Sequence, residues 1–363
     1  MKKNQRLFIT DCEGPISKND NAFEITSKFI PKGELLFSQL SKYDDITAGI
    51  VKRNGYNAGD TLKLIIPFLK AYGITSSQMR IYSSENILLM PGAKYTMSII
   101  QDKMPSFIVS TSYNQYIQPL CEVLEFPFEN TYCTKVDIDA YKVDEKECRR
   151  IRHLREEICS MPPFKIHHSA KSIEDLSDRD QQTFGRLDEI IWDEIAHMQL
   201  GVALYEVNPM GGFEKERAVK DIARKTGGKL RDVMYVGDSI TDVESFRLVK
   251  EKGGITISFN GNAFAVKEAE IAVLSENTLV TATLAQVFAD QGRDSTLKLI
   301  DEREQDSFEK LNSDLLSENK IEKWHSKTSP EISRITDQNV NEISDKSTIF
   351  RKLVRGEKVG KLG

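Results

Sequence analysis

Short runs of consecutive apolar residues alternate along this chain with longer stretches in which apolar residues recur every three or four positions. The first pattern is typical of strands buried on both faces of a parallel sheet, and the second is typical of amphipathic helices. The predicted strands are 7–10, 106–110, 233–236 and 254–257. Strands that alternate with helices in this way predict an α/β fold built on a Rossmann-like parallel sheet.

Helical spacing is clearest in the segments 33–53, 60–72, 114–124, 149–158 and 187–198. In the second of these, an apolar face runs from Leu62 to Leu69. Pro119 predicts a kink or a boundary within the third segment, because proline lacks the N–H group that a helix interior uses. Pro162 and Pro163 separate the last two segments.

The pattern changes after about residue 292. The remainder, 293–363, holds equal numbers of acidic and basic residues and few large apolar ones. Such a segment cannot bury enough apolar surface to form a core of its own. It is predicted to be a charged extension, helical or flexible. Leu311, Leu315 and Leu316 offer one amphipathic turn that could dock on the body of the protein or on a protein partner.

Composition narrows the class of protein. A chain of 363 residues suggests about two domains, or one domain with large insertions. The 50 Lys and Arg against 55 Asp and Glu leave no basic excess for binding nucleic acid. No run of about 18 apolar residues predicts a membrane span, and the N-terminus does not resemble a secretory signal. The five cysteines form no CxxC pair, so we expect reduced thiols and a cytoplasmic location.

Acidic residues follow two of the predicted strands directly. Asp11 and Glu13 come after 7–10, and Asp238 and Asp242 come after 233–236. Ligands bind at the carboxyl ends of parallel strands, and paired carboxylates at such an edge suit an oxygen-ligated cation such as Mg²⁺. A cation would also relieve the repulsion between Asp11 and Asp238. The alternative interpretation is that each Asp caps the helix that follows it.

Two further polar positions accompany the acids. Ser110 and Thr111 stand at the end of the strand 106–110, where hydroxyl and backbone N–H groups can bind an anion. Lys215 opens a helical segment ahead of 233–236, although a lysine there is by itself usually a surface residue. In this order, Asp-x-Glu, Ser, Lys and Gly-Asp-x-x-x-Asp resemble the motifs of the haloacid dehalogenase-like (HAD) superfamily. The flanking segments 90–93 and 254–260 are similar to its phosphoserine-phosphatase-like branch.

This resemblance implies a phosphatase that hydrolyses a small phosphomonoester, such as a phosphorylated metabolite. Asp11 would be the nucleophile that carries an aspartyl-phosphate. Glu13 would protonate the leaving oxygen and then activate water. Ser110, Thr111 and Lys215 would bind the phosphoryl group and offset its charge.

The resemblance also implies a Mg²⁺ cofactor. Asp11, the backbone carbonyl of Glu13 and Asp238 would hold the ion, and Asp242 would join directly or through water. The family's phosphatases carry Asp where Glu13 stands, and a displacement near 1 Å can cost about 10²-fold in rate. Two alternatives therefore stay open. One is transfer of the phosphoryl group to an acceptor other than water, and the other is a non-catalytic HAD-fold protein that regulates or binds a partner.

The motif positions divide the chain. The segments are a catalytic core of 1–15, 91–139 and 206–292, a helical cap at 16–90, a second helical insertion at 140–205 and the charged extension at 293–363. In this family such insertions govern the choice of substrate. Lys18, Lys52 and Arg53 in the first insertion could contact an anionic substrate group or be solvated surface charges.

Overall fold

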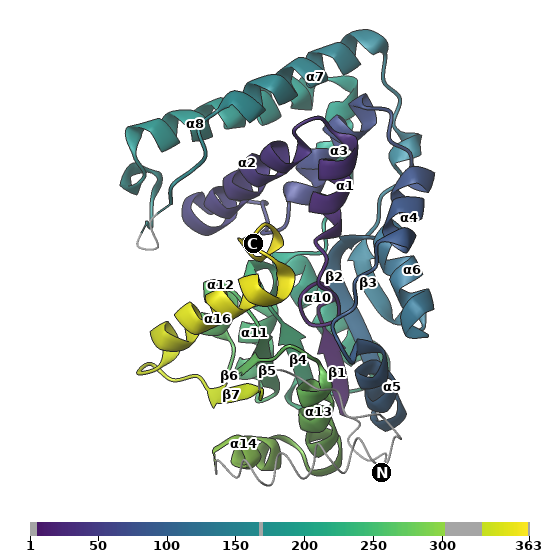
Figure 1. Cartoon of the computed structure of the whole chain (residues 1–363), viewed down its shortest axis with the longest axis vertical. Coiled ribbons are helices and arrows are strands. Elements are labelled where there is room, and N and C mark those ends of the chain that lie inside the picture. The colour runs from purple at the N-terminus through teal and green to yellow at the C-terminus, as the bar shows by residue number, and fades with distance from the viewer. Residues whose placement is uncertain (1–5, 167–169, 302–328, 362–363) are drawn as a thin grey trace.

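The computed structural model describes residues 6–166, 170–301 and 329–361. A seven-stranded sheet lies at the centre of this part of the chain, in the order β3-β2-β1-β4-β5-β6-β7 (Figure 1). The strands are β1 (Leu7–Thr10), β2 (Ser106–Tyr113), β3 (Thr131–Thr134), β4 (Val233–Gly237), β5 (Ile255–Phe259), β6 (Ile271–Leu274) and β7 (Glu331–Arg334). Strands β1 to β6 are parallel, and β7 pairs antiparallel with β6. The predicted α/β fold and its four predicted strands are confirmed.

Helices cover both faces of the sheet. One face carries α5 (Ala93–Lys103), α6 (Asn114–Leu124) and α13 (Leu279–Gln291), and the other carries α10 (Gly212–Thr226), α11 (Val243–Glu251) and α12 (Ala263–Glu268). The side chains of successive β1 residues point to opposite faces of the sheet. Phe8 packs with the first group, whereas Leu7 and Ile9 pack with the second, because side chains alternate along a strand.

Helix α6 runs through Pro119 to Leu124, so the boundary predicted at this proline is wrong. Ile117 and Leu120 of the same helix are buried against the sheet. Tertiary packing of an apolar face supplies most of a helix's stability, and here it outweighs the hydrogen bond that proline removes.

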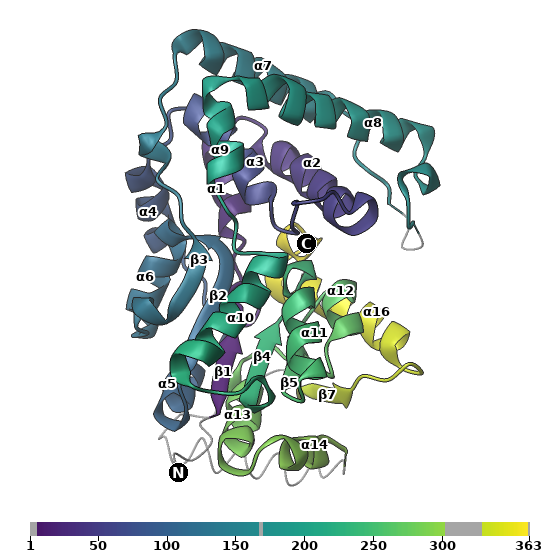
Figure 2. The same cartoon turned by 180° about the vertical axis from the view of Figure 1, so that it is seen from behind.

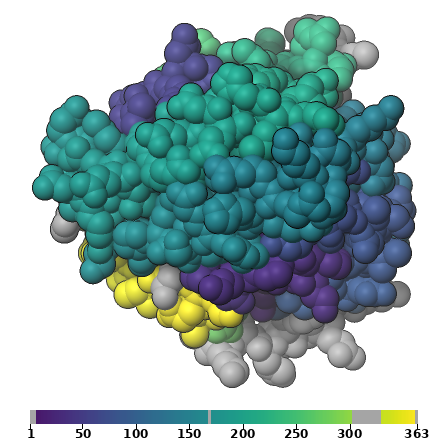
Figure 3. Space-filling view, turned by 90° about the horizontal axis from the view of Figure 1, so that it is seen from above, coloured from purple at the N-terminus to yellow at the C-terminus, as the bar shows by residue number. Residues whose placement is uncertain are grey.

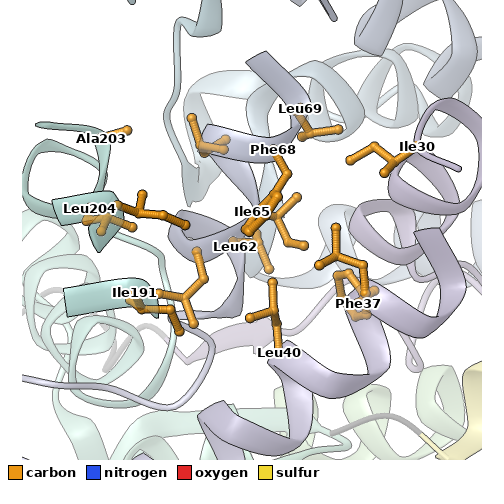
Figure 4. Packing of buried hydrophobic residues seen from close by; sticks show 14 of the residues in the cluster. Ile30, Phe37, Leu40, Leu62, Ile65, Phe68, Leu69, Ile191, Ala203 and Leu204 are labelled. Atoms are coloured by element: carbon orange, nitrogen blue, oxygen red, sulfur yellow. The ribbon is translucent and has the colours of Figure 1, made fainter. Parts of the chain in front are cut away.

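The two segments that were predicted as insertions, 16–90 and 140–205, pack together into one helical unit, which is called the cap below. The first provides α1 (Asn21–Phe29), α2 (Gly33–Asp45), α3 (Thr61–Ala71) and α4 (Ser76–Glu85), and the second provides α7 (Glu145–Ser160), α8 (Asp178–Asp188) and α9 (Ala203–Glu206). Figure 4 shows Ile65 of α3, Leu40 of α2 and Leu204 of α9 within one shared apolar cluster. Side chains of the second insertion cover most of this end of the molecule (Figure 3).

The described part of the charged extension lies on the core. It comprises α14 (Arg293–Asp301), the edge strand β7 and α16 (Val340–Arg355). Helix α16 packs beside α12, as both views show (Figures 1 and 2), and its Ser347 hydroxyl donates to the Gly261 carbonyl oxygen over 2.6 Å. The predicted docking turn at Leu311, Leu315 and Leu316 lies outside the described residues.

Among the helices in the described part of the chain, none is both long enough and apolar enough to cross a membrane.

Candidate active site

Asp11 and Asp238 lie side by side because the strands that they follow are neighbours. Strands β1 and β4 pair in parallel with Thr10 beside Val236, and the Asp11 N–H donates to the Val236 carbonyl oxygen over 2.8 Å. Both carboxylates therefore stand at the carboxyl edge of the sheet, where ligands bind in parallel α/β folds. Both residues are buried, at 5% and 2% exposure.

Asp242 is folded back onto this pair by a turn of 3-10 helix, Ile240–Asp242. Its Oδ2 accepts hydrogen bonds from the backbone N–H groups of Asp238, at 3.0 Å, and Ser239, at 3.1 Å. One oxygen from each of Asp11, Asp238 and Asp242 lies within 4.8 Å of the others. Three hard oxygen donors at this separation fit Mg²⁺.

Lys215 supplies positive charge to this carboxylate cluster from the buried side, away from the cavity. It projects from α10 with no exposed surface, and its Nζ lies 2.7 Å from Asp11 Oδ2 and 2.8 Å from Asp242 Oδ1. The Tyr235 hydroxyl also donates to Asp242 Oδ1, over 2.7 Å. Both oxygens of Asp242 therefore already accept hydrogen bonds.

Burial dominates the acid–base behaviour of the pair. Burial raises the pKa of Asp11 to about 7, although Lys215 lowers it, and the nearby Asp242 and Asp238 raise it further. Burial by itself lowers the pKa of Lys215, but Asp11 and Asp242 together hold that pKa above its ordinary value. Lysine therefore stays charged, and a further cation beside Asp11 would favour the ionised carboxylate that a nucleophile requires.

The loop after β1 turns sharply at Gly14, whose φ is +103°. A Cβ atom there would lie 2.1 Å from Asp238 Oδ2, so the position requires glycine. On the same loop, Glu13 Oε1 accepts a hydrogen bond from the Asn21 N–H over 2.8 Å. Burial, with Asp20 nearby, holds the pKa of Glu13 well above its usual range. A carboxyl group whose pKa is raised in this way can serve as a general acid.

The predicted residues meet at one cavity of about 100 Å³ between the sheet edge and the cap. Its wall includes Asp11, Glu13, Ser110, Thr111 and Asp238. Lys215 and Asp242 lie behind this wall, where Lys215 pairs with Asp11 and Asp242 accepts a hydrogen bond from the Asp238 N–H. The Ser110 hydroxyl oxygen accepts from the Ser112 N–H over 3.2 Å. The Thr111 hydroxyl donates to the Met210 carbonyl oxygen over 3.0 Å, so its proton is already engaged.

The basic residues of the first insertion do not line this cavity. Lys52 and Arg53 line a separate, wider groove of about 940 Å³ between the cap and α10–α12. Arg53 pairs there with Asp188, at 2.5 Å from Nη2 to Oδ1. Lys18 contributes a backbone carbonyl oxygen, which accepts a hydrogen bond from Arg355 Nε over 3.2 Å.

Two residues that the sequence patterns do not single out complete the wall of the active-site cavity. Arg351 and Arg355 of α16 line it, and both guanidinium groups pair with Asp238 Oδ2. Arg355 Nη1 is 3.1 Å from that oxygen, and Arg351 Nη1 also donates to the Asp238 carbonyl oxygen over 3.2 Å. Their four-residue spacing places them on one helix face. This spacing is the one feature of the sequence that could have pointed to the pair.

Comparison of the sequence with protein-family models and with curated proteins finds no match. Among solved structures, the gene product AF1437 from Archaeoglobus fulgidus is similar over 99% of both chains, with a TM-score of 0.80 and 24% identity. A phospho-aspartyl intermediate analogue of phosphoserine phosphatase matches 74% of this chain and 93% of its own, with a TM-score of 0.45 and 16% identity. A substrate-bound phosphoserine phosphatase complex matches 75% and 93%, with a TM-score of 0.44 and 14% identity.

The predicted fold, a Rossmann-like parallel sheet with helices on both faces, is confirmed. Its parallel sheet places the Asp11, Ser110 and Asp238 motifs at one carboxyl edge, and α10 brings Lys215 to the same point. The carboxyl edge of the parallel sheet is therefore the part of this chain that carries the candidate chemistry.

Proposed function

We propose that the protein is a Mg²⁺-dependent phosphatase that hydrolyses a small phosphomonoester through an aspartyl-phosphate on Asp11. One observation carries the proposal. Asp11 is paired with Lys215 and lies beside Asp238 and Asp242 at the wall of a cavity between the sheet edge and the cap. That cavity, of about 100 Å³, favours a small substrate.

The donor set supports Mg²⁺ as the cofactor. Asp11, Asp238 and the backbone carbonyl of Glu13 would hold the ion. Asp242 would take part through water, because both of its carboxylate oxygens already accept hydrogen bonds. When bound, the ion would neutralise charge on the carboxylates and on the phosphoryl oxygens.

The positions of the side chains support a two-step reaction. A carboxylate oxygen of Asp11 attacks phosphorus, and the bond to the leaving oxygen breaks as Glu13 donates a proton to that oxygen. Glu13 then accepts a proton from the water that attacks the aspartyl-phosphate, releasing phosphate and regenerating Asp11. Lys215 and Ser110 hold the phosphoryl group in line, which is the main requirement of phosphoryl transfer.

Release of phosphate from p-nitrophenyl phosphate tests the proposal. We expect turnover by the wild type with Mg²⁺ and none with EDTA. Asp11→Asn should lower the rate by about 10³-fold or more, because it removes the nucleophile. Asp221→Asn is the matched control, since Asp221 lies on α10 in a surface contact with Lys225, and it should keep the wild-type rate. Equal rates for wild type and Asp11→Asn would contradict the proposal.

Transfer to another acceptor is the second candidate, and Glu13 is the reason to retain it. A general base displaced from its usual position would slow attack by water, so the aspartyl-phosphate would survive long enough to meet an acceptor alcohol. Product analysis with and without added alcohols separates hydrolysis from transfer. Binding of Mg²⁺ without turnover of any ester would instead favour the non-catalytic interpretation.

A further inference from the structure

Strand β2 is irregular where it meets the active-site cavity. From Ser110 to Tyr113 it advances three residues, while the neighbouring strand β3 advances only one. The two residues in between, Thr111 and Ser112, make up a β-bulge, and both line the cavity. Bulges are frequent beside active sites, because the extra residues turn a side chain out of the regular alternation of the strand.

Hydrogen bonds on both sides of Ser112 fix the position of this bulge. The Thr111 hydroxyl donates to the Met210 carbonyl oxygen over 3.0 Å. The Tyr113 hydroxyl donates to the Leu62 carbonyl oxygen in the cap over 2.5 Å. The bulge is therefore tied to the core on one side and to the cap on the other, and Ser112 is held between the two ties.

The hydroxyl group of Ser112 differs from those of its two neighbours. Ser112 is 3% exposed, yet its hydroxyl oxygen has no hydrogen-bond partner of ordinary geometry among the described residues. A buried hydroxyl that bonds to nothing costs free energy. Its place in the cavity wall therefore indicates a role in the chemistry of the cavity.

The nearest candidate for that role is the carboxyl group of Glu13. Burial raises the pKa of Glu13 well above its ordinary value and Asp20 adds to the rise, whereas the nearby Ser112 hydroxyl, as a donor, lowers it. The two groups are therefore close, although the contact falls short of an ordinary hydrogen bond. Hydrogen bonds between catalytic groups are often long or poorly aligned in an enzyme without its substrate, and they shorten in the complex.

Glu13 has one donor whose position is already fixed. The N–H group of Asn21, the first residue of α1, donates to Glu13 Oε1 over 2.8 Å. In the proposed reaction Glu13 gives its proton to the leaving oxygen and remains an anion until it takes a proton from water. A carboxylate with little access to solvent is stabilised by each hydrogen bond that it accepts, so a second donor favours this stage of the reaction.

We propose that Ser112 is a positioning residue for Glu13, and that its hydroxyl donates a hydrogen bond to the Glu13 carboxylate formed when the leaving oxygen is protonated. Ser112 keeps its own proton, so the protons that move are the one that Glu13 gives to the leaving oxygen and the one that it takes from water. A glutamate has one more rotatable bond than an aspartate, and the Ser112 hydroxyl helps to fix it. The inference rests on the proposed phosphatase function, because it takes Glu13 as the general acid and base.

Steady-state rates with two esters test this inference. The leaving group of p-nitrophenyl phosphate needs little protonation, whereas that of propyl phosphate needs it. The measured quantity is kcat/KM, which reports the steps up to formation of the aspartyl-phosphate. Ser112→Ala should lower kcat/KM for propyl phosphate by about 10-fold or more, and that for p-nitrophenyl phosphate by no more than about threefold, as loss of one hydrogen bond to a charged group predicts.

Ser106→Ala is the matched control. Ser106 lies on the same strand and is 2% exposed, but its hydroxyl donates to the Met104 carbonyl oxygen and it does not line the cavity. This variant should keep the wild-type ratio of the two kcat/KM values. Ser112→Thr, which retains a hydroxyl, should keep most of that ratio. Circular dichroism checks the fold of each variant, and Ser112→Cys, whose thiol is a weak donor, replaces Ser112→Ala if the latter does not fold.

A double-mutant cycle with Glu13→Gln shows whether Ser112 acts through Glu13. In the Glu13→Gln background, Ser112→Ala should change kcat/KM for propyl phosphate by less than about twofold, because the general acid that Ser112 positions is gone. An undiminished effect in that background, or an unchanged ratio in a folded Ser112→Ala, would overturn the inference while the phosphatase proposal stands. If the wild type with Mg²⁺ hydrolyses neither ester, the phosphatase proposal fails and the inference fails with it.

Discussion

Replacing Lys215 by methionine tests how much the Lys215 ammonium group stabilises the buried carboxylates of Asp11 and Asp242. The change keeps the side chain long and apolar but removes the ammonium group that lies 2.7 Å from Asp11 and 2.8 Å from Asp242. Both carboxylates stay buried without this partner. Removing one member of a buried ion pair typically costs about 3–5 kcal/mol in the free energy of unfolding, and here one lysine serves two acids. We expect a loss at the upper end of that range when metal is absent.

Urea denaturation in excess EDTA measures this loss. Lys220→Met is the matched control, because Lys220 lies on the same helix, is 53% exposed and pairs with Glu216 at the surface. That exposed pair should contribute no more than about 1 kcal/mol. If Lys215→Met is no less stable than Lys220→Met in EDTA, the buried charge cluster does not stabilise the fold as we have argued.

The same variant reports on the metal site. Because Lys215→Met leaves more uncompensated negative charge at Asp11, added Mg²⁺ should stabilise it by more than it stabilises the wild type. The measurement is the difference in unfolding free energy between excess Mg²⁺ and excess EDTA. A gain in the variant that is no larger than in the wild type would refute the assignment of a cation to these carboxylates.

Three further changes test other parts of the structure. Gly14→Ala should weaken Mg²⁺ binding by at least about 10-fold in a calorimetric titration, because the new Cβ displaces Asp238 Oδ2 and φ is +103°. Gly55→Ala, where the space is open, should leave Mg²⁺ binding unchanged. Equal effects of the two substitutions would contradict this reasoning. Glu13→Gln should slow the hydrolysis of alkyl phosphates by about 10²-fold or more. It should slow the hydrolysis of p-nitrophenyl phosphate by less, since a good leaving group needs little protonation. Equal slowing of both esters would argue against Glu13 as the general acid. Burial, with Asp60 and Asp45 nearby, raises the pKa of Asp44 to about 7. The native state therefore keeps a proton on Asp44 that the unfolded chain loses between about pH 4 and pH 7. Wild-type stability falls as pH rises through this window. The melting temperature of Asp44→Asn relative to wild type should therefore rise from pH 5 to pH 8, and an unchanged difference would refute the shift.

The strands of the core were predictable where an apolar run stands alone between polar segments. Val233 to Val236 is such a run, and the acid that follows it is at once a sequence signal and a site residue. Strand β3 (Thr131–Thr134) offers no such signal, because it is short and half of it is polar. Strand β7 (Glu331–Arg334) is weaker still, since it pairs antiparallel at the sheet edge and remains only partly buried.

The cap shows a different limit of local patterns. The apolar face from Leu62 to Leu69 predicted a helix that packs on something, and α3 is that helix. Its partners include Ile191 and Leu204 of the second insertion (Figure 4). Periodicity shows which face of a helix is buried, but it does not show which of several apolar faces will cover it.

The sequence by itself determined the strands that matter for the site, the acids at their carboxyl ends and the order of the four motifs, because each is a signal contained within a few neighbouring residues. Tertiary structure alone decided that Asp11 and Asp238 stand together on adjacent strands and that Arg351 and Arg355 lie against Asp238. Those arginines are 113 and 117 residues from Asp238 along the chain. Such a contact depends on how whole elements pack, and the local spacing of residues carries no record of it.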